Sequence, residues 1–256
     1  MEGMSGYEAE AEFYDYAWET LKVDIAFYRR RLQGSHKVLD CMCGTGRVAI
    51  ALARAGFRVD GIDSSVEMLR QARRRARTEA PRVRARLRWY CGDITQSSPS
   101  SDHDAAIIAV NSYGLILRES DRIRALQRIR AAVRQGGKLY LALDSVRSYR
   151  RIRDGVPFLT TVRPVGRGAR TYLRVMVEFG SAAARARSTT LHALIGRSGH
   201  VMRTEVTETR TAVLSPSQVK KELVRAGFRV TDLCGDYDGS AYSPTGDRFI
   251  VEAVRA

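Results

Sequence analysis

The stretch Val38-Leu39-Asp40-Cys41-Met42-Cys43-Gly44-Thr45-Gly46-Arg47 decides the fold class, together with the segment that follows it. Its first residues form a short apolar run, which predicts a strand that ends in a glycine-containing turn. Good helix formers follow over residues 48–54 and stop at Gly56, a typical helix terminator. Residues 57–62 are again apolar in pattern, so the sequence predicts a strand-turn-helix-strand unit.

The same alternation continues along the chain. Ser64 and Glu67 have the spacing of a capping box and predict a helix over residues 66–77. Further strands are predicted at residues 87–91, 105–110 and 138–143, with a helix over residues 120–134. Continuous apolar strands separated by helices must be covered on both faces, so the fold class is α/β with a doubly wound, mostly parallel sheet.

The pattern changes after about residue 155, where apolar and polar residues alternate. This alternation predicts antiparallel strands over residues 160–162, 171–177 and 201–213. Ser215 and Gln218 form a second capping box, which predicts a helix through Arg225, and the tail is a last strand at residues 247–253. We therefore expect three parts: residues 1–155 with an amphipathic helical segment over 7–33, an antiparallel β insertion over 156–213, and residues 214–256, which complete the core sheet.

The turn after the first strand has the physical properties of a nucleotide-like site. It leaves backbone N–H groups free at the start of a helix, and Gly44 and Gly46 let a ligand approach that backbone closely. Asp63 ends the second strand at the same edge of the sheet, where a carboxylate can accept hydrogen bonds from two ribose hydroxyls. The spacing Gly44-x-Gly46-x-x-Ala49 also matches the dinucleotide fingerprint, so a nicotinamide cofactor such as NAD is the alternative.

A wider set of motifs resembles class I S-adenosylmethionine-dependent methyltransferases, in the branch that acts on glycine, sugar amines and natural products. The block Val38–Arg47 is similar to the first motif of that family, and Gly92-Asp93-Ile94 is similar to its turn after strand three. Asp104 with Asn111-Ser112-Tyr113 resembles strand four and its substrate-facing end. The resemblance implies a seven-stranded sheet with an antiparallel last strand, and an inserted antiparallel β lid.

The resemblance also implies a set of cofactor-binding residues for S-adenosylmethionine. Asp40 would bind the methionine ammonium group, Asp63 the ribose, and Asp93 the adenine amino group. The full implied set is Asp40, Cys43, Gly44, Thr45, Gly46, Ile62, Asp63, Ser64, Asp93, Ile94 and Asn111. Plainer roles stay open for two of them, since Asp93 can form an Asx turn and Asp40 can cap a strand end. Met42 departs from the family, which usually has glycine there, and it either points into the core or partly fills the pocket.

Catalytic residues are not identified by the sequence. Methyl transfer to an amine needs mainly in-line positioning, whereas a hydroxyl or carbon acid needs a base. The candidates for that base are His192, His200 and Asp144. Four aromatic residues are candidates for lining an acceptor pocket, although packing explains them as well: Tyr14, Tyr16, Trp18 and Tyr113.

Composition and charge restrict the partners. The net charge of +15 suits a polyanion partner, but 38 of the 43 basic residues are arginines scattered along the chain, as a compositional bias would also produce. Nucleic-acid base methyltransferases often carry Asn/Asp-Pro-Pro-Tyr after strand four, and this chain has Asn111-Ser112-Tyr113-Gly114. We therefore expect a small-molecule acceptor and disfavour RNA or protein acceptors.

Other sequence features suggest an ordinary cytoplasmic enzyme. No apolar run reaches the length of a membrane span, the first residues lack a secretory signal, and the four cysteines and four histidines do not cluster at metal-ligand spacing. The sequence predicts no membrane partner and no metal site. The antiparallel insertion also offers a surface on which a homodimer could form.

Overall fold

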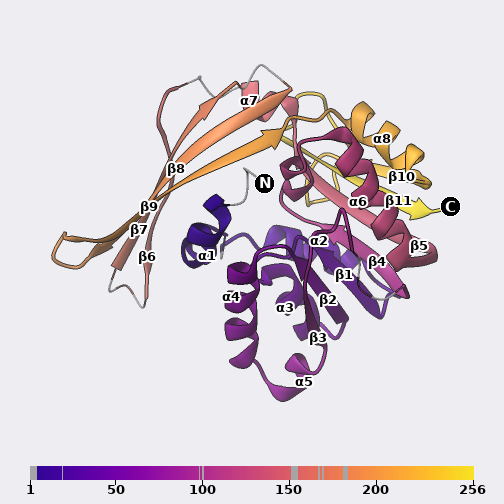
Figure 1. The fold of residues 1–256 in the computed structure, drawn as a ribbon, viewed down its shortest axis with the longest axis horizontal. Helices are drawn as coiled ribbons and strands as arrows, with labels where there is room; N and C mark the ends of the chain where they lie inside the picture. The colour runs from indigo at the N-terminus through magenta and orange to yellow at the C-terminus, as the bar shows by residue number, and fades with distance from the viewer. Residues whose placement is uncertain are drawn as a thin grey trace.

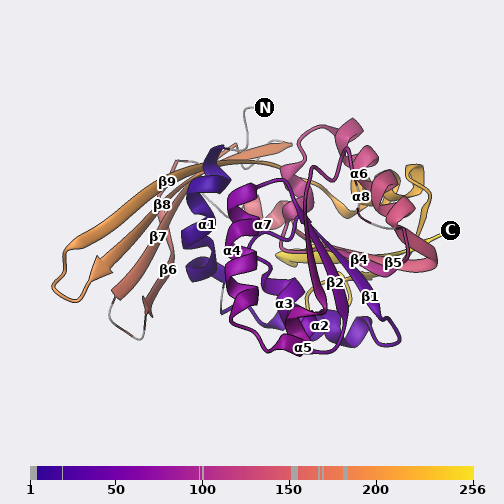
Figure 2. The same ribbon diagram turned by 60° about the horizontal axis from the view of Figure 1, so that its bottom comes forward.

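The computed structural model describes residues 5–18, 20–97, 99, 101–150, 155–166, 168, 170–180 and 184–256. These residues form two β-sheets with helices (Figures 1 and 2). The helices are α1 (Ser5–Trp18), α2 (Val23–Arg31), α3 (Arg47–Arg54), α4 (Val66–Arg77), α5 (Pro81–Arg84), α6 (Glu119–Ala132), α7 (Val146–Arg150) and α8 (Pro216–Arg225), with one 3₁₀ helix, η1 (Ser112–Leu115). No helix within the described ranges is both long enough and apolar enough to cross a lipid bilayer.

The larger sheet has seven strands in the order β10-β11-β5-β4-β1-β2-β3. Its members are β1 (Lys37–Cys41), β2 (Arg58–Asp63), β3 (Leu87–Cys91), β4 (His103–Ile108), β5 (Val133–Asp144), β10 (Phe228–Cys234) and β11 (Arg248–Arg255). β1 to β5 pair in parallel, whereas β11 is antiparallel to both β5 and β10. The predicted doubly wound sheet with an antiparallel last strand is confirmed.

Helices cover both faces of this sheet, as its buried apolar strands require. One core cluster joins α6 and α8 to β4, β5 and β11, with Leu126 and Leu223 among the helix residues. The other joins α2 and α3 to β1 and β2 through residues such as Phe27 and Leu52. The chain order reverses between β1 and β4, and this switch point in an open α/β sheet is where ligands bind, outside the carboxyl ends of the strands.

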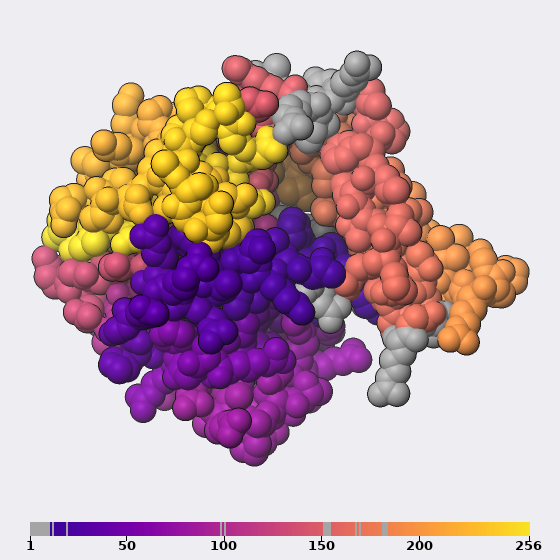
Figure 3. Space-filling model, turned by 180° about the vertical axis from the view of Figure 1, so that it is seen from behind, coloured from indigo at the N-terminus to yellow at the C-terminus, as the bar shows by residue number. Residues whose placement is uncertain are grey.

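The smaller sheet, which we call the second sheet, consists of β6 (Phe158–Val165), β7 (Arg170–Phe179), β8 (Arg185–Gly196) and β9 (Val201–Ala212). All of its pairs are antiparallel, as predicted. It packs against α1 and η1 through β9. Seen from behind, the surface is hollowed between the salmon residues of β6 and the yellow C-terminal residues of the larger sheet (Figure 3).

Several predicted elements need correction. Ser65, not Ser64, is the N-cap of α4, because its hydroxyl accepts from the Met68 N–H. β4 ends at Ile108, so Ala109 and Val110 lie outside the strand. The N-terminal segment is two helices separated at residues 20–22.

The sequence analysis did not predict β8, α5 or α7. In β8 the buried positions include Ser188, Thr190 and His192, so the strand lacks the apolar alternation that identifies a half-buried strand. The capping box at Ser215 and Gln218 is present and starts α8. The three-part division at residues 155 and 213 stays a prediction.

Candidate functional site

A small pocket lies at the switch point of the larger sheet. Residues after β1 and residues after β4 line it from two sides, and Tyr14 of α1 lines it from a third. The lining consists of Tyr14, Asp40, Met42, Cys43, Arg47, Val48, Ala109, Val110 and Ser112. The parallel strands bring together two segments that are about seventy residues apart in the chain. Of the predicted cofactor residues, the pocket contains Asp40 and Cys43, and Gly44, Thr45 and Gly46 continue the same turn.

Asp40 is the acidic side chain among the residues that line this pocket. Its side chain is buried, and its Oδ2 atom has no hydrogen-bond partner within the described part of the chain. Burial raises the pKa of Asp40 to about 7, although the neighbouring Arg47 guanidinium opposes this shift. Buried polar atoms are normally paired, so an unpaired carboxylate oxygen at a pocket fits a cationic group such as an ammonium.

Arg47 does not fill that role, because it is paired elsewhere. Its guanidinium donates to both carboxylate oxygens of Asp24, at 3.0 and 2.5 Å, and to the Leu21 carbonyl oxygen at 2.8 Å. Both charged side chains are buried. The sequence analysis missed Arg47, although an arginine that follows Gly46 and begins a buried helix is a signal for such an ion pair.

The turn after β1 needs glycine for packing against Trp89, and close approach of a ligand to its backbone stays a prediction. Gly44 and Gly46 have φ of 53° and 73°, a region that glycine occupies at little cost. A Cβ atom on Gly46 would lie 2.4 Å from the Trp89 ring, so only glycine fits there. Thr45 is fully buried, and its hydroxyl donates to Asp15 of α1 at 2.6 Å, which holds α1 across the turn.

Asp63 lies beside the turn. Its Oδ2 accepts from the Gly44 N–H at 2.8 Å and its Oδ1 accepts from the Ser65 N–H at 2.9 Å. Burial raises the pKa of Asp63, and these amide hydrogen bonds oppose that shift. The carboxylate therefore lies beside the turn, at the predicted edge of the sheet, and its hydrogen bonds brace the turn, whereas its ribose-binding role stays a prediction.

The remaining predicted cofactor residues lie along the same edge. Ile62 and Ile94 are buried in the core, and Ser64 is exposed. Asp93 forms the Asx turn of the plainer alternative, because its Oδ1 accepts from the Thr95 N–H at 2.8 Å. An adenine-binding role for Asp93 stays a prediction.

Asn111 joins the ends of β4 and β5. Its Oδ1 accepts from the Asp144 N–H at 3.2 Å, and its Nδ2 donates to the Tyr149 hydroxyl at 2.7 Å. Val110 and Asn111 have φ of 47° and 61°, which is rare for residues other than glycine and especially so for a β-branched valine. Such strain costs of order 1–3 kcal/mol per residue and gathers at functional sites. Val110 is a pocket residue that the sequence analysis did not identify.

Met42 fits both alternatives of the sequence analysis, in which it points into the core or partly fills the pocket. It packs against the core cluster of β4, β5 and α6, and it also lines the pocket beside Asp40. Its φ of 57° is the left-handed conformation that favours glycine. A methionine at this position therefore narrows the pocket and strains the turn.

The candidate bases differ in position. His192 is fully buried in the second sheet, where its two ring nitrogens face the hydroxyls of Tyr172 at 2.8 Å and Thr207 at 3.4 Å. Burial lowers its pKa to about 4, so it is neutral at pH 7. His200 lies exposed at the β8–β9 turn. Asp144 is the candidate at the sheet edge, and burial raises its pKa while Arg248 opposes the shift.

The four aromatic candidates also lie in different surroundings. Tyr14 lines the pocket. Tyr16 packs on Tyr172 with ring centroids 5.6 Å apart, and Trp18 faces the Arg174 guanidinium at 5.6 Å. Tyr113 is fully buried and donates to Glu222, so it does not face an open pocket.

Comparisons with known proteins agree with this geometry. Residues 38–137 match the family described as "Methyltransferase domain". A protein of Geobacillus sp. strain WCH70 that is named as a methyltransferase is 26% identical over 97% of this chain and 99% of its own length. The glycine/sarcosine N-methyltransferase of Parasynechococcus marenigrum is 35% identical over 50% of this chain, but the match spans only 45% of that enzyme.

Solved structures share the fold across nearly the whole chain. An S-adenosylmethionine-dependent methyltransferase from Clostridium acetobutylicum has a TM-score of 0.78 at 16% identity, over 95% of this chain and 96% of the other. The S-adenosylmethionine-bound amino pentose methyltransferase CalS10 from Micromonospora echinaspora has a TM-score of 0.74 at 18% identity, over 95% and 97%. The predicted methyltransferase resemblance is confirmed.

Proposed function

Since residues 38–137 match the methyltransferase-domain family, we propose that this chain transfers a methyl group from S-adenosylmethionine to a nitrogen or oxygen atom of a small-molecule acceptor. The observation that carries the proposal is the buried Asp40 carboxylate at the switch point, whose Oδ2 atom has no hydrogen-bond partner among the described residues. The ammonium of the cofactor's methionine part would supply a cation to this oxygen.

The surrounding residues fit the rest of that cofactor. The Gly44 to Gly46 backbone, which carries no Cβ atom at residues 44 and 46, would lie against the methionine part. Asp63 would exchange its hydrogen bond from the Gly44 N–H for bonds from ribose hydroxyls. Tyr14 of α1 would close the pocket above the turn.

In this proposal, the acceptor binds at the carboxyl ends of β4 and β5. S-adenosylmethionine brings a sulfonium that already activates the methyl group, so the protein's main task is in-line positioning at about 3–3.5 Å. Asn111 holds Tyr149 and the Asp144 backbone at this edge. Asp144, with its raised pKa, is the side chain best suited to accept a proton from an acceptor that must lose one.

Parallel calorimetric titrations test this proposal. We expect S-adenosylmethionine and S-adenosylhomocysteine to bind with micromolar dissociation constants and NAD to show no heat of binding. Binding of NAD alone would indicate a dinucleotide enzyme instead. Absence of binding by all three would reject the cofactor site.

A second experiment concerns the acceptor. Transfer of a radiolabelled methyl group is measured with pools of small amines and alcohols, and separately with RNA and with protein. We expect incorporation into the small molecules. Incorporation into RNA or protein alone would overturn the small-molecule part of the proposal and leave the cofactor part standing.

A further inference from the structure

The segment after β4, residues 109–118, has a backbone conformation that its own sequence does not favour. Val110 and Asn111 are consecutive left-handed residues, and Val110 is β-branched. Ala109, Val110 and Ser112 nevertheless form one wall of the pocket that contains Asp40. A strained segment persists only where the surrounding structure holds it, so the contacts of residues 109–118 identify what holds this wall in place.

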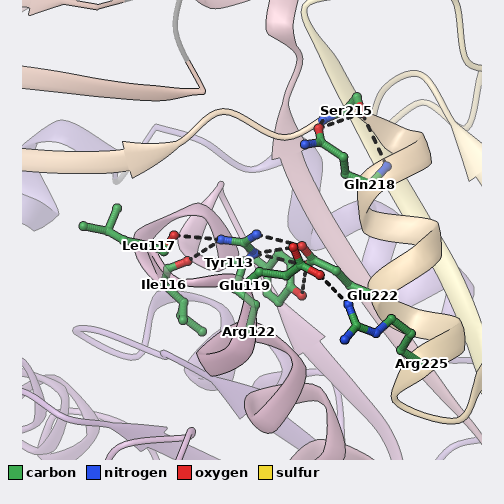
Figure 4. Close-up of polar contacts among 9 residues, drawn as sticks. All are labelled: Tyr113, Ile116, Leu117, Glu119, Arg122, Ser215, Gln218, Glu222 and Arg225. Atoms are coloured by element: carbon green, nitrogen blue, oxygen red, sulfur yellow. Dashed lines mark hydrogen bonds and ion pairs between the residues drawn. The ribbon is translucent and has the colours of Figure 1, made fainter.

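A buried charged network whose members do not line the pocket holds the segment (Figure 4). The Tyr113 hydroxyl donates to Glu222 Oε2 of α8 at 2.6 Å. Arg122 of α6 binds the same carboxylate, with Nη2 donating to Oε1 at 2.7 Å and Nε donating to Oε2 at 3.0 Å. All three side chains are buried, so the hydrogen bonds form away from competing water.

The same arginine also holds the end of the segment. Its Nη1 atom donates to the carbonyl oxygens of Ile116 at 3.0 Å and Leu117 at 3.1 Å. Glu222 therefore anchors residue 113 directly and orients the guanidinium that anchors residues 116 and 117. Burial beside Glu222 raises the pKa of Tyr113, so its hydroxyl stays a donor at all physiological pH values.

The segment of residues 109–118 also packs against the second sheet. A Cβ atom on Gly114 would lie 2.8 Å from the Thr211 methyl group and 3.0 Å from the Ala212 carbonyl oxygen, so the segment sits directly on the end of β9. The segment thus contacts α6, α8 and β9, and its residues 109, 110 and 112 line the pocket.

We propose that Glu222 is a positioning residue for the methyl-transfer site: through Tyr113 and Arg122 it keeps Val110 and Asn111 in the left-handed conformation that shapes the pocket wall. Glu222 itself lies on α8 and lines no part of the pocket. The inference rests on the proposed function only in that it takes this pocket to be the cofactor site.

The first test compares Tyr113→Phe with Tyr140→Phe. Each variant removes one buried tyrosine hydroxyl, but the Tyr140 hydroxyl donates to the Arg31 carbonyl oxygen, away from the pocket. One lost hydrogen bond of ordinary strength corresponds to about a fivefold change in an equilibrium constant. We expect Tyr113→Phe to weaken S-adenosylhomocysteine binding about fivefold and Tyr140→Phe to leave it unchanged, although both lower the melting temperature.

Hydrogen exchange gives a readout that does not depend on any ligand. The Asn111 N–H donates to the Ala142 carbonyl oxygen and the Gly114 N–H to the Asn111 carbonyl oxygen, so both amides report the geometry of the segment. We expect faster exchange of these amides in Tyr113→Phe and not in Tyr140→Phe. If wild type binds no S-adenosylhomocysteine, the proposed function fails, and this exchange comparison still decides the role of Glu222.

A double-mutant cycle connects the effect to Glu222. If Glu222 acts through Tyr113, the double variant of Glu222→Gln and Tyr113→Phe loses no more affinity than the more affected single variant. Fully additive losses would overturn the proposal, as would equal affinity and equal exchange in the two tyrosine variants. Should Glu222→Gln fail to fold, the tyrosine pair alone decides.

Discussion

Two segments with left-handed backbone form the pocket, and they reach that conformation in different ways. The turn after β1 uses Gly44 and Gly46, which accept a positive φ because they lack a Cβ atom. The segment after β4 uses Val110 and Asn111, which do not favour it, and it depends on Glu222 and its partners. A local sequence signal specifies the first wall of the pocket, whereas tertiary contacts impose the second.

Met42 is an exception within the first segment. It has φ of 57° without being glycine, and it packs on the core while lining the pocket. The turn is therefore mostly, but not wholly, encoded by glycine. The predictions below distinguish a backbone conformation that glycine allows locally from one that tertiary contacts impose.

The largest effect is expected from a variant that disrupts the buried network around Glu222. Arg122→Met leaves the Glu222 carboxylate buried without its cation, which costs about 3–5 kcal/mol of unfolding free energy. Arg225→Met is the matched control, because Arg225 also joins α8 to α6, through Glu119, but both of those side chains are exposed. An exposed pair contributes about 0–1 kcal/mol. Urea unfolding measures both variants, and equal losses would contradict the assigned role of the buried pair.

In the glycine turn, Asp63→Ala is expected to have the next largest effect. The carboxylate that accepts from the Gly44 and Ser65 amides would be lost together with its ribose contacts. Charge-assisted hydrogen bonds are worth about 1.5–3 kcal/mol each, so S-adenosylhomocysteine affinity should fall by about 100-fold or more with the circular dichroism spectrum unchanged. Asp102→Ala, an exposed carboxylate at the opposite end of the strands, is the control. Unchanged affinity in Asp63→Ala would reject the ribose assignment.

Cofactor affinity should depend on pH through Asp40. Its pKa of about 7 in the folded protein lies above the ordinary value of 3.8. Its contribution to the stability of the ligand-free protein is therefore complete below about pH 4 and is lost as the pH rises through 7. Ammonium binding needs the ionised form, so affinity should rise about tenfold between pH 6 and pH 8. Asp40→Asn should remove both dependences; if the variant keeps the wild-type pH profile, another group is responsible.

The smallest effect is expected at Met42. Met42→Gly and Met42→Ala both take the long side chain out of the pocket, so both should tighten S-adenosylhomocysteine binding about threefold. Only glycine also relieves the positive φ, so Met42→Gly should be about 1 kcal/mol more stable than Met42→Ala. Calorimetry and chemical denaturation measure the two effects separately. Weaker binding in both variants would mean that Met42 contributes a ligand contact.

The sequence analysis succeeded where one chemical property governs one position. Glycines 44 and 46, the acid at 63 and the alternation of strands and helices were enough to predict the sheet and the turn. It failed for β8, because the buried face of that strand is polar, and for the conformation of Val110, although it pointed to the neighbouring Asn111-Ser112-Tyr113 segment. No local feature of Val110 indicates a left-handed backbone, since valine favours extended structure.

The aromatic candidates make the same point. Tyr14, Tyr16, Trp18 and Tyr113 are alike in sequence as large residues near predicted elements, yet only Tyr14 reaches the pocket. The other three pack against Tyr172, Arg174 and Glu222. Their partners come from distant parts of the chain, so sequence spacing could not separate them.

By itself, the sequence determined the fold class and the first wall of the site, because strand periodicity and the steric freedom of glycine act over a few neighbouring residues. Only the tertiary structure decided the conformation of the second wall, the pairing of Arg47 with Asp24 and the missing partner of the Asp40 Oδ2 atom. Those features depend on which side chains from α2, α6 and α8 are buried together, and burial is a property of the assembled fold.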